Sequence, residues 1–440
     1  MKNKKWMAIL LGGIMAASLA APCSVSAAEK TTLTFWHAMG GTNGEVLQQI
    51  VDDFNASQDE IEVKAEYQGT YDDTITKLKA AMQSDSGLPD VCQMYDVGTK
   101  FMYDSGAVIP VEDKFESTGY DKSSVMEVIS SYYTVDGKQY AMPFNVSTPM
   151  LYYNKDVFEA AGLDPETPPT TYDEVLEDAK KIVDSGAAPV GYSQAIYGWF
   201  FEQQLAGLGV TYGNNDNGRK EAVTAVDFDS NGGGLKVFDM WKKLYDSGCF
   251  EDYGTTTADT QTAFFSGQVG MIIESTAILK NAVDSSPFEV GTGYLPRIEQ
   301  NDEGGVIIGG GSLWLTDTGN EANEDAAWKF IEYITTPDVQ AKWSMGTGYF
   351  AINEKAYETE DMKAYLKENP NFETAINQLK DSPVNCNTAG VLSGVQTEAR
   401  LTFNEIMPQV YDGKLTTQDA VDQLAASVNK AIENYNESIK

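Results

Sequence analysis

The sequence predicts an α/β protein with two lobes, each an open, mostly parallel sheet flanked by helices, and a cleft between the lobes. Short apolar strands alternate with amphipathic helices along much of the chain, which is the pattern of parallel sheets. The 440 residues are enough for two or three domains with sizeable cores. Neither a sequence repeat nor a long linker separates the halves, which favours lobes that share the chain over independent domains. In such folds ligands bind beyond the carboxyl ends of the strands, here between the lobes.

The first 28 residues have the pattern of a secretory signal peptide. Three lysines near the start precede an apolar run and then small residues, with Val25-Ser26-Ala27 as an A-x-A-like cleavage site. The apolar run is too short for a stable membrane span. We expect an exported protein, in the periplasm or at the outer face of the cytoplasmic membrane, with cleavage near Ala28. Lipid attachment at Cys23 is the alternative, which Pro22 before it fits less well.

The first third after the leader alternates strands and helices. A short apolar strand covers 33–36, and the segment 42–45 (Thr-Asn-Gly-Glu) forms a capping box for the helix that follows. Residues 61–67 alternate as a half-buried strand, apolar side chains recur at helical spacing from Tyr71, and the next strand covers 89–94. This order predicts a largely parallel sheet.

The rest of the chain continues the alternation, with cap signals at element ends. Thr171 and Glu174 form a second capping box, and Gly186 is placed to end that helix. The remaining predicted strands are 150–153, 269–273, 288–294 and 306–315. The remaining predicted helices are 156–161, 198–208, 232–247, 326–334 and 421–435. We expect one lobe to combine 29–142 with 306–350, and the other to combine 143–305 with 351–440.

The charge of the chain excludes some classes of partner. Removing the three lysines of the leader leaves 28 basic against 65 acidic residues, a net charge of −37. So acidic a surface argues against nucleic acid and anionic membranes as partners, and its ordinary explanation is solubility. A positive charge retained in a pocket would therefore stand out.

Few side chains are available for metal or covalent chemistry. Beyond the leader the cysteines are Cys92, Cys249 and Cys386, an odd number without C-x-x-C spacing, so neither a disulfide framework nor a zinc site is predicted. The single histidine, His37, ends the first predicted strand, where a structural role is favoured over catalysis. We expect no enzyme, no cofactor and no metal. A secreted glycosidase that uses only carboxylates is the alternative from another class, because acidic residues are abundant.

Two kinds of segment have the composition of ligand-contacting turns. The run 308–312 (Ile-Gly-Gly-Gly-Ser) lets backbone approach a ligand closely at Gly310, and a bulge or a hinge between lobes is an equal alternative. Ser147, in the polar turn 143–149, and Ser275, after an apolar strand, could present hydroxyls to a ligand. A turn or capping role is the alternative for both serines.

Aromatic and arginine side chains supply the other candidates. Trp199 lies in a predicted helix, where core packing is the default, whereas Tyr349 follows the end of a helix and is better placed to face a cleft. Arg400 is one of only three arginines. A salt bridge to one of many carboxylates competes with bidentate capture of a phosphate or carboxylate.

Four blocks of the sequence resemble a known family. They are TFWHAM (34–39), 143–174, VIIGGGSLW (306–314) and TGYFAINEKAY (347–357). They resemble extracellular solute-binding family 1 of bacterial ABC uptake systems, which includes maltose-binding proteins, and within it the branch that binds sn-glycerol 3-phosphate. The resemblance covers essentially the whole chain after the leader. It implies the two-lobed, type II periplasmic-binding-protein-like fold, and a monomer that closes on one ligand and docks on membrane permease subunits.

Carried over by position, the resemblance implies a set of ligand contacts in this chain. Tyr71 and Asp96 are expected to hold ligand hydroxyls, and Trp199 to cover the carbon chain. The phosphate end is expected to meet Ser147, Ser275, the Gly310 amide, Tyr349 and Arg400.

Two departures from the family pattern affect the polyol end of the site. Asp96 stands where the family has a glutamate, one methylene longer, and Ile196 stands at the first tryptophan of a Gly-Trp-x-Gly-Trp segment. One stacking wall is therefore lost, or rebuilt with Tyr197. We expect a receptor for glycerol 3-phosphate or a related glycerophosphodiester, with an oligosaccharide receptor as the alternative.

Overall fold

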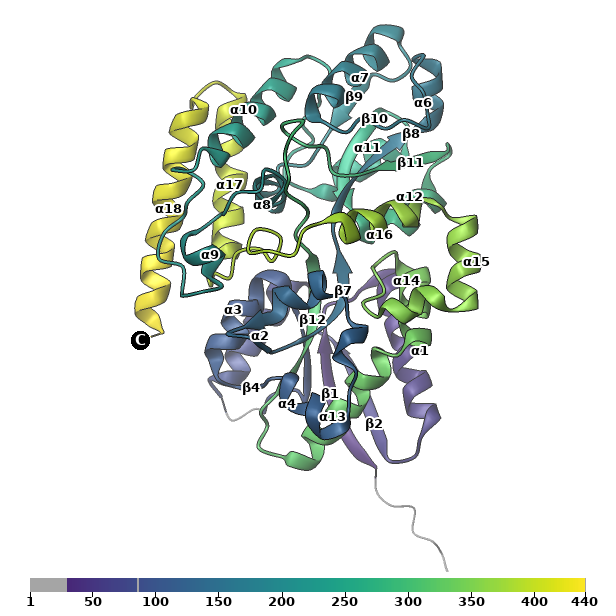
Figure 1. The fold of residues 1–440 in the computed structure, drawn as a ribbon, viewed down its shortest axis with the longest axis vertical. Helices are drawn as coiled ribbons and strands as arrows, with labels where there is room; N and C mark the ends of the chain where they lie inside the picture. Colours follow the sequence, from purple (N-terminus) through teal and green to yellow (C-terminus); the bar gives the residue numbers. More distant parts are fainter. Residues whose placement is uncertain (1–29, 85–86, 440) are drawn as a thin grey trace, which may run out of the picture.

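The computed structural model describes residues 30–84 and 87–439, and the chain forms two lobes stacked one above the other (Figure 1). The predicted leader, its cleavage site and Cys23 lie outside the described residues. Each lobe has its own sheet and its own helices. The α/β class with two lobes, predicted from the sequence, is confirmed.

The first lobe is built on a six-stranded sheet. Its strands are, across the sheet, β2 (Ile61–Tyr67), β1 (Thr31–His37), β3 (Val91–Tyr95), β12 (Gly309–Thr316) and β4 (Val108–Ile109), with β7 (Met142–Ser147) also paired to β12. β1 is parallel to β2 and β3, whereas β12 is antiparallel to β3, β4 and β7. A short hairpin of β5 (Thr134–Val135) and β6 (Lys138–Gln139) lies outside this sheet.

The second lobe has a four-stranded sheet. Its order is β11 (Val290–Gly293), β8 (Pro149–Asn154), β10 (Val269–Ser275) and β9 (Val190–Ser193). Only β9 and β10 run parallel in it. The expectation of mostly parallel sheets is therefore wrong in detail. Parallel neighbours need a crossover helix between them, whereas β7, β8 and β12 lie where the chain passes between lobes and pair antiparallel.

Helices cover the faces and sides of both sheets. In the first lobe they are α1 (Gly41–Ser57), α2 (Tyr71–Met82), α3 (Thr99–Ser105), α4 (Glu112–Thr118), α5 (Glu127–Ser130), α13 (Glu321–Ile334) and α14 (Pro337–Thr347). Toward the second lobe they are α6 (Lys155–Ala160), α7 (Tyr172–Ser185), α8 (Gly198–Gly207), α9 (Asn214–Gly218), α10 (Gly233–Asp246), α11 (Thr257–Phe265), α12 (Leu279–Ser285), α15 (Glu360–Glu368), α16 (Asn371–Asp381), α17 (Gln396–Tyr411) and α18 (Thr417–Ser438). Two large apolar clusters result, one centred on each lobe.

The starts of α7, α1 and α2 test the capping signals that the sequence predicts. The capping box of Thr171 and Glu174 is present at α7, and Gly186 ends that helix in a left-handed conformation. The capping box expected at 42–45 is wrong, because α1 already begins at Gly41 and has no side-chain cap. A capping box forms instead at Thr70 and Asp73, in front of α2.

The lobes touch in places beyond the crossing strands. α18 descends beside the second lobe and ends near α3 of the first, where the Tyr435 hydroxyl donates to Asp104 at 2.6 Å (Figure 1). Tyr95, at the end of β3, lies 2.7 Å from the Thr397 hydroxyl on α17. The structure therefore shows the lobes closed on one another.

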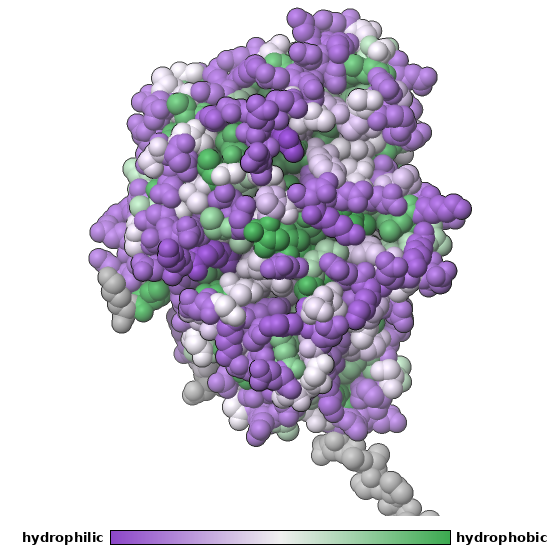
Figure 2. All heavy atoms as spheres, viewed as in Figure 1, coloured by the Kyte–Doolittle hydropathy of each residue, from purple (hydrophilic) through white to green (hydrophobic). Residues whose placement is uncertain are grey.

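The described surface is mostly polar, and the described thiol and imidazole groups are free cysteines and one buried histidine. Figure 2 shows a mostly hydrophilic face, as the charge of the chain implies. Within the part of the chain that the structure describes, no helix is long and apolar enough to cross a membrane. Cys92, Cys249 and Cys386 are free thiols. His37 is buried, its Nδ1 accepts the Met39 amide, and burial lowers its pKa to about 4, which is the behaviour of a structural histidine.

Candidate ligand-binding site

Arg400 lies on α17, and two carboxylates hold its guanidinium. Nε and Nη2 donate to Oε1 and Oε2 of Glu202, on α8, both at 2.7 Å. Nη2 also donates to Oδ2 of Asp96 at 2.7 Å. These three residues, named the Arg400 cluster below, have side chains only 7–9% exposed. Because Asp96 follows β3 of the first lobe while the other two belong to the second, the cluster spans the interface between lobes.

Close helix packing explains why Glu202 reaches Arg400. A Cβ at Gly198 would lie 2.5 Å from the Arg400 Cα, so only glycine lets the start of α8 meet the α17 backbone there. Glu202 follows Gly198 by four residues and therefore lies on the same face of α8. The two carboxylate oxygens of Glu202 then accept hydrogen bonds from the guanidinium in a bidentate, charge-assisted pair.

The electrostatics of the cluster are dominated by burial and by the excess of carboxylates. Burial raises the pKa of Glu202, although Arg400 counteracts this. For Arg400, burial lowers the pKa, but Asp96 and Glu202 outweigh it and raise the pKa above its ordinary value. With both carboxylates ionised, two negative charges face one positive charge, and the cluster carries a net charge of −1.

A second polar group lies in the first lobe, around Asn145 of β7. The Asn145 amide nitrogen donates to the Tyr71 hydroxyl at 2.6 Å, and its Oδ1 accepts from Gln93, also at 2.6 Å. The Tyr71 ring stacks on Tyr95, with centroids 5.1 Å apart. Burial raises the pKa of Tyr349, and hydrogen bonding with Asn145 and Tyr71 lowers it in part, so this hydroxyl belongs to the same group.

The glycine run joins this group to Trp199. Gly310 has φ +95°, and a Cβ there would lie 1.9 Å from the Asn145 carbonyl oxygen, so the position requires glycine. Gly309 on β12 pairs with Ser147 on β7, and the Trp199 ring packs over Gly309. Trp199 is 5% exposed, and its buried Nε1 has no hydrogen-bond partner among the described residues.

The remaining predicted positions behave differently. The Ser275 hydroxyl accepts the Ala277 amide at 3.1 Å and so caps a short turn, which was the alternative that the sequence left open. Ile196 is fully buried in the second-lobe core and forms no ligand wall. Tyr197 is half-buried, and its ring centroid lies 6.2 Å from that of Trp199. Burial raises the pKa of its hydroxyl, Arg400 lowers that pKa, and Asp96 and Glu202 raise it.

Sequence reasoning missed two residues that organise the site, Glu202 and Asn145. Both are buried polar residues, and a buried polar side chain indicates a buried polar partner. The partners themselves, Arg400 and Tyr71, lie 198 and 74 positions away along the chain, and no local pattern identifies them.

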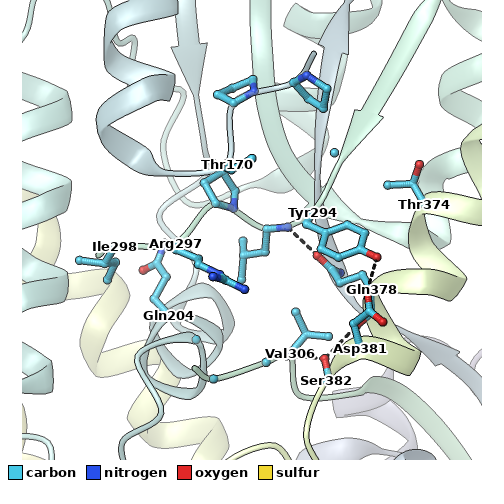
Figure 3. A pocket seen from close by; sticks show the side chains of 18 of the residues that line it. Thr170, Gln204, Tyr294, Arg297, Ile298, Val306, Thr374, Gln378, Asp381 and Ser382 are labelled. Carbon is cyan, nitrogen blue, oxygen red and sulfur yellow. Dashed lines mark hydrogen bonds between the residues drawn. The ribbon is translucent and has the colours of Figure 1, made fainter. Parts of the chain in front are cut away.

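A separate pocket of about 560 Å³ lies in the second lobe (Figure 3). It is lined by the end of β11, by α16, and by the crossing segment 304–306, and Tyr294 there donates to Asp381 at 2.7 Å. None of the eight predicted site residues lines it. The candidate site is the closed interface between the lobes.

The site is suited to holding a polar solute. Asp96 and Glu202 bind the same guanidinium from two sides, so they are not the separated, free acid and base that a glycosidase needs. Among residues 30–84 and 87–439, no group of three or more His, Cys, Asp or Glu side chains could hold a metal ion. Two lobes closed over buried polar and aromatic side chains define a solute receptor.

Comparison with known proteins identifies the family. The model of the bacterial extracellular solute-binding protein family matches residues 49–374, and the chain belongs to this family. The sn-glycerol-3-phosphate-binding periplasmic protein UgpB of Escherichia coli K12 is 30% identical over 417 residues, covering 93% of this chain and 94% of that protein.

Solved structures share the fold. UgpB from Mycobacterium tuberculosis, in complex with glycerophosphocholine, has a TM-score of 0.79 at 20% identity and covers 93% of this chain and 100% of that one. The cyclic alpha-maltosyl-1,6-maltose binding protein from Arthrobacter globiformis has a TM-score of 0.77 at 26% identity, over 92% of this chain and 100% of that one.

Proposed function

We propose that the chain is the solute-binding component of an ABC uptake transporter, and that it captures glycerol 3-phosphate or a related glycerophosphodiester. The observation that carries this proposal is the buried Arg400 at the lobe interface. Its Nη1 makes no hydrogen bond within the described residues, so the in-plane donors of this nitrogen remain for an anion. The relative that is 30% identical over nearly its full length binds sn-glycerol 3-phosphate by name, which supports the same ligand class here.

The charge of the Arg400 cluster favours the diester within this class. A phosphate monoester carries a charge of about −1.5 to −2 at neutral pH, whereas a diester carries a single negative charge. The cluster has two carboxylates for one guanidinium, so a second ligand charge adds repulsion in a buried site. A glycerophosphodiester meets Arg400 with the smaller penalty.

The other residues would hold the rest of the ligand. In this proposal Tyr349, Ser147, Ser275 and the Gly310 amide help Arg400 at the phosphate, although Ser275 must then give up its capping bond. Tyr71 and Asp96 hold the glycerol hydroxyls, and the free Nε1 of Trp199 donates to a ligand oxygen. The closed, loaded monomer would then dock on permease subunits at the outer face of the membrane.

An oligosaccharide is the second candidate, and one observation favours it. Both Glu202 and Asp96 already occupy Nε and Nη2 of Arg400, as in a structural ion cluster that needs no anionic ligand. Carboxylates, tyrosines and a tryptophan are also suitable partners for sugar hydroxyls and faces. The Arthrobacter globiformis protein, at 26% identity, binds a cyclic maltose derivative by name.

Tryptophan fluorescence separates the two candidates, because Trp199 lies in the site. Titrations with glycerol 3-phosphate, glycerophosphocholine and maltotriose should give a saturable change with the phosphorylated ligands. Trp199→Phe should remove most of that change, while Trp328→Phe, a buried tryptophan of the first lobe, should keep it. Saturation by maltotriose alone would overturn the proposal.

A further inference from the structure

We propose that Glu202 determines the anion specificity of the site: when an anion reaches Arg400, Glu202 takes up a proton from solvent and loosens its hold on the guanidinium. This inference rests on the proposed function, because it requires an anionic ligand. It concerns a residue that has no part in the expected set of ligand contacts.

The geometry of Glu202 singles it out within the cluster. It takes two of the three hydrogen bonds that Arg400 makes there, Nε to Oε1 and Nη2 to Oε2, whereas Asp96 takes one. Glu202 is 6% exposed and lies on the same lobe as Arg400, so the pair stays together when the lobes open. The guanidinium is therefore already neutralised before a ligand arrives.

An arriving anion must compete with that carboxylate. Adding a negative charge beside Arg400 gives three negative groups around one guanidinium, in a buried environment where repulsion is poorly screened. Protonation of one carboxylate relieves this repulsion and restores balance. The helices need not move, because only the position of one proton and the direction of one hydrogen bond change.

Glu202 is suited to take up that proton, because it is buried and holds the guanidinium through both of its oxygens. Burial already raises its pKa, and each added negative charge raises it further. Once protonated, it can still donate or accept a bond within the cluster. The charged or titratable groups that face it are Arg400 from α17, Asp96 from the first lobe, Tyr197 at the start of α8, and Tyr212 from the loop after α8, with the Gln396 amide also bonded to it.

The sign of the linkage follows from this arrangement. If the bound state holds more protons than the free state, affinity falls as pH rises through the range above the ordinary glutamate pKa of 4.5. The effect must be larger for a monoester than for a diester, because the monoester brings more charge. Glu202 thus makes the site prefer singly charged ligands at neutral pH.

Calorimetry in two buffers of different ionisation enthalpy measures the proton uptake directly. Glycerophosphocholine is the probe, because its phosphodiester charge is constant over the pH range used. We expect uptake of a fraction of a proton per ligand for the full-length, unmodified chain, and none for Glu202→Gln. The variant should bind this probe on the order of tenfold tighter than the unmodified chain near pH 8, with the two converging at lower pH.

Two further variants keep the test decisive. Glu202→Asp retains a titratable group and should retain the uptake. Asp302→Asn removes another buried acid with a raised pKa, one that does not contact Arg400, and should behave as the unmodified chain does. If Glu202→Gln does not fold, the measurement on the unmodified chain still decides. Binding of the probe without proton uptake overturns the role of Glu202 and leaves the proposed function intact, whereas failure of both phosphorylated ligands to bind overturns the function itself.

Discussion

Replacing Arg400 by alanine should destabilise the ligand-free protein, because it leaves Asp96 and Glu202 buried without a counter-charge. Arg400 makes three hydrogen bonds of 2.7 Å to these two carboxylates, and all three side chains are less than one-tenth exposed. Removing one member of a buried ion pair typically costs about 3–5 kcal/mol. We expect a loss in that range near neutral pH, measured by urea unfolding.

The same reasoning predicts how that loss is recovered. The combined variant Asp96→Asn, Glu202→Gln, Arg400→Met removes every charge and keeps the volume of the site, so it should regain most of the lost stability. Lowering the pH should also shrink the penalty of Arg400→Ala, because the orphaned carboxylates take up protons. A loss below about 1 kcal/mol, or a loss that the combined variant does not recover, would show that the cluster is not a buried ion pair in solution.

Three further changes test the parts around the cluster. His37→Gln should remove up to about 3 kcal/mol of the pH dependence of the unfolding free energy between pH 6.5, the ordinary histidine pKa, and about 4, the lowered value. In that range the unfolded chain binds the proton and the folded chain does not, so stability falls as the pH falls. Equal urea midpoints for both proteins across that range would contradict this. Gly310→Ala should lower the unfolding free energy by at least about 2 kcal/mol, through backbone strain and collision with Asn145. Gly319→Ala is the control, because Gly319 also has a positive φ but lies in open space, so it measures the strain alone. Equal losses in the two variants would refute the collision. Trp199→Phe should weaken ligand binding about tenfold by removing the free Nε1 donor, and an unchanged Kd by calorimetry would show that a ligand does not use it.

Local signals in the sequence predicted most of the elements. The capping box at Thr171 and Glu174 and the apolar periodicity from Tyr71 gave α7 and α2 their starts, because both depend only on neighbouring residues. The direction of the strands was not predictable in the same way. β12 pairs with β3, which lies more than 200 residues earlier, and the antiparallel sense follows from the path of the chain between lobes.

In the candidate site, too, some features follow from neighbouring residues and others depend on contacts between distant segments. Gly310 was expected where the backbone approaches a ligand, with a bulge or hinge as the alternative; in the structure its close neighbour is the Asn145 backbone, and the contact with a ligand stays a prediction. For Arg400 the sequence left a salt bridge and an anion clamp both open, and the structure shows the ion pair. Its partner Glu202 could not be identified, because the contact depends on the approach of α8 to α17 at Gly198.

Calorimetric titration of glycerophosphocholine and maltotriose into the same sample tests most directly whether the site between the lobes takes a phosphorylated glycerol. The account predicts saturable one-to-one binding of glycerophosphocholine, lost on the scale of about 2–5 kcal/mol in Arg400→Ala, and no heat of binding with maltotriose. Binding of maltotriose, together with unchanged glycerophosphocholine affinity in Arg400→Ala, would contradict it.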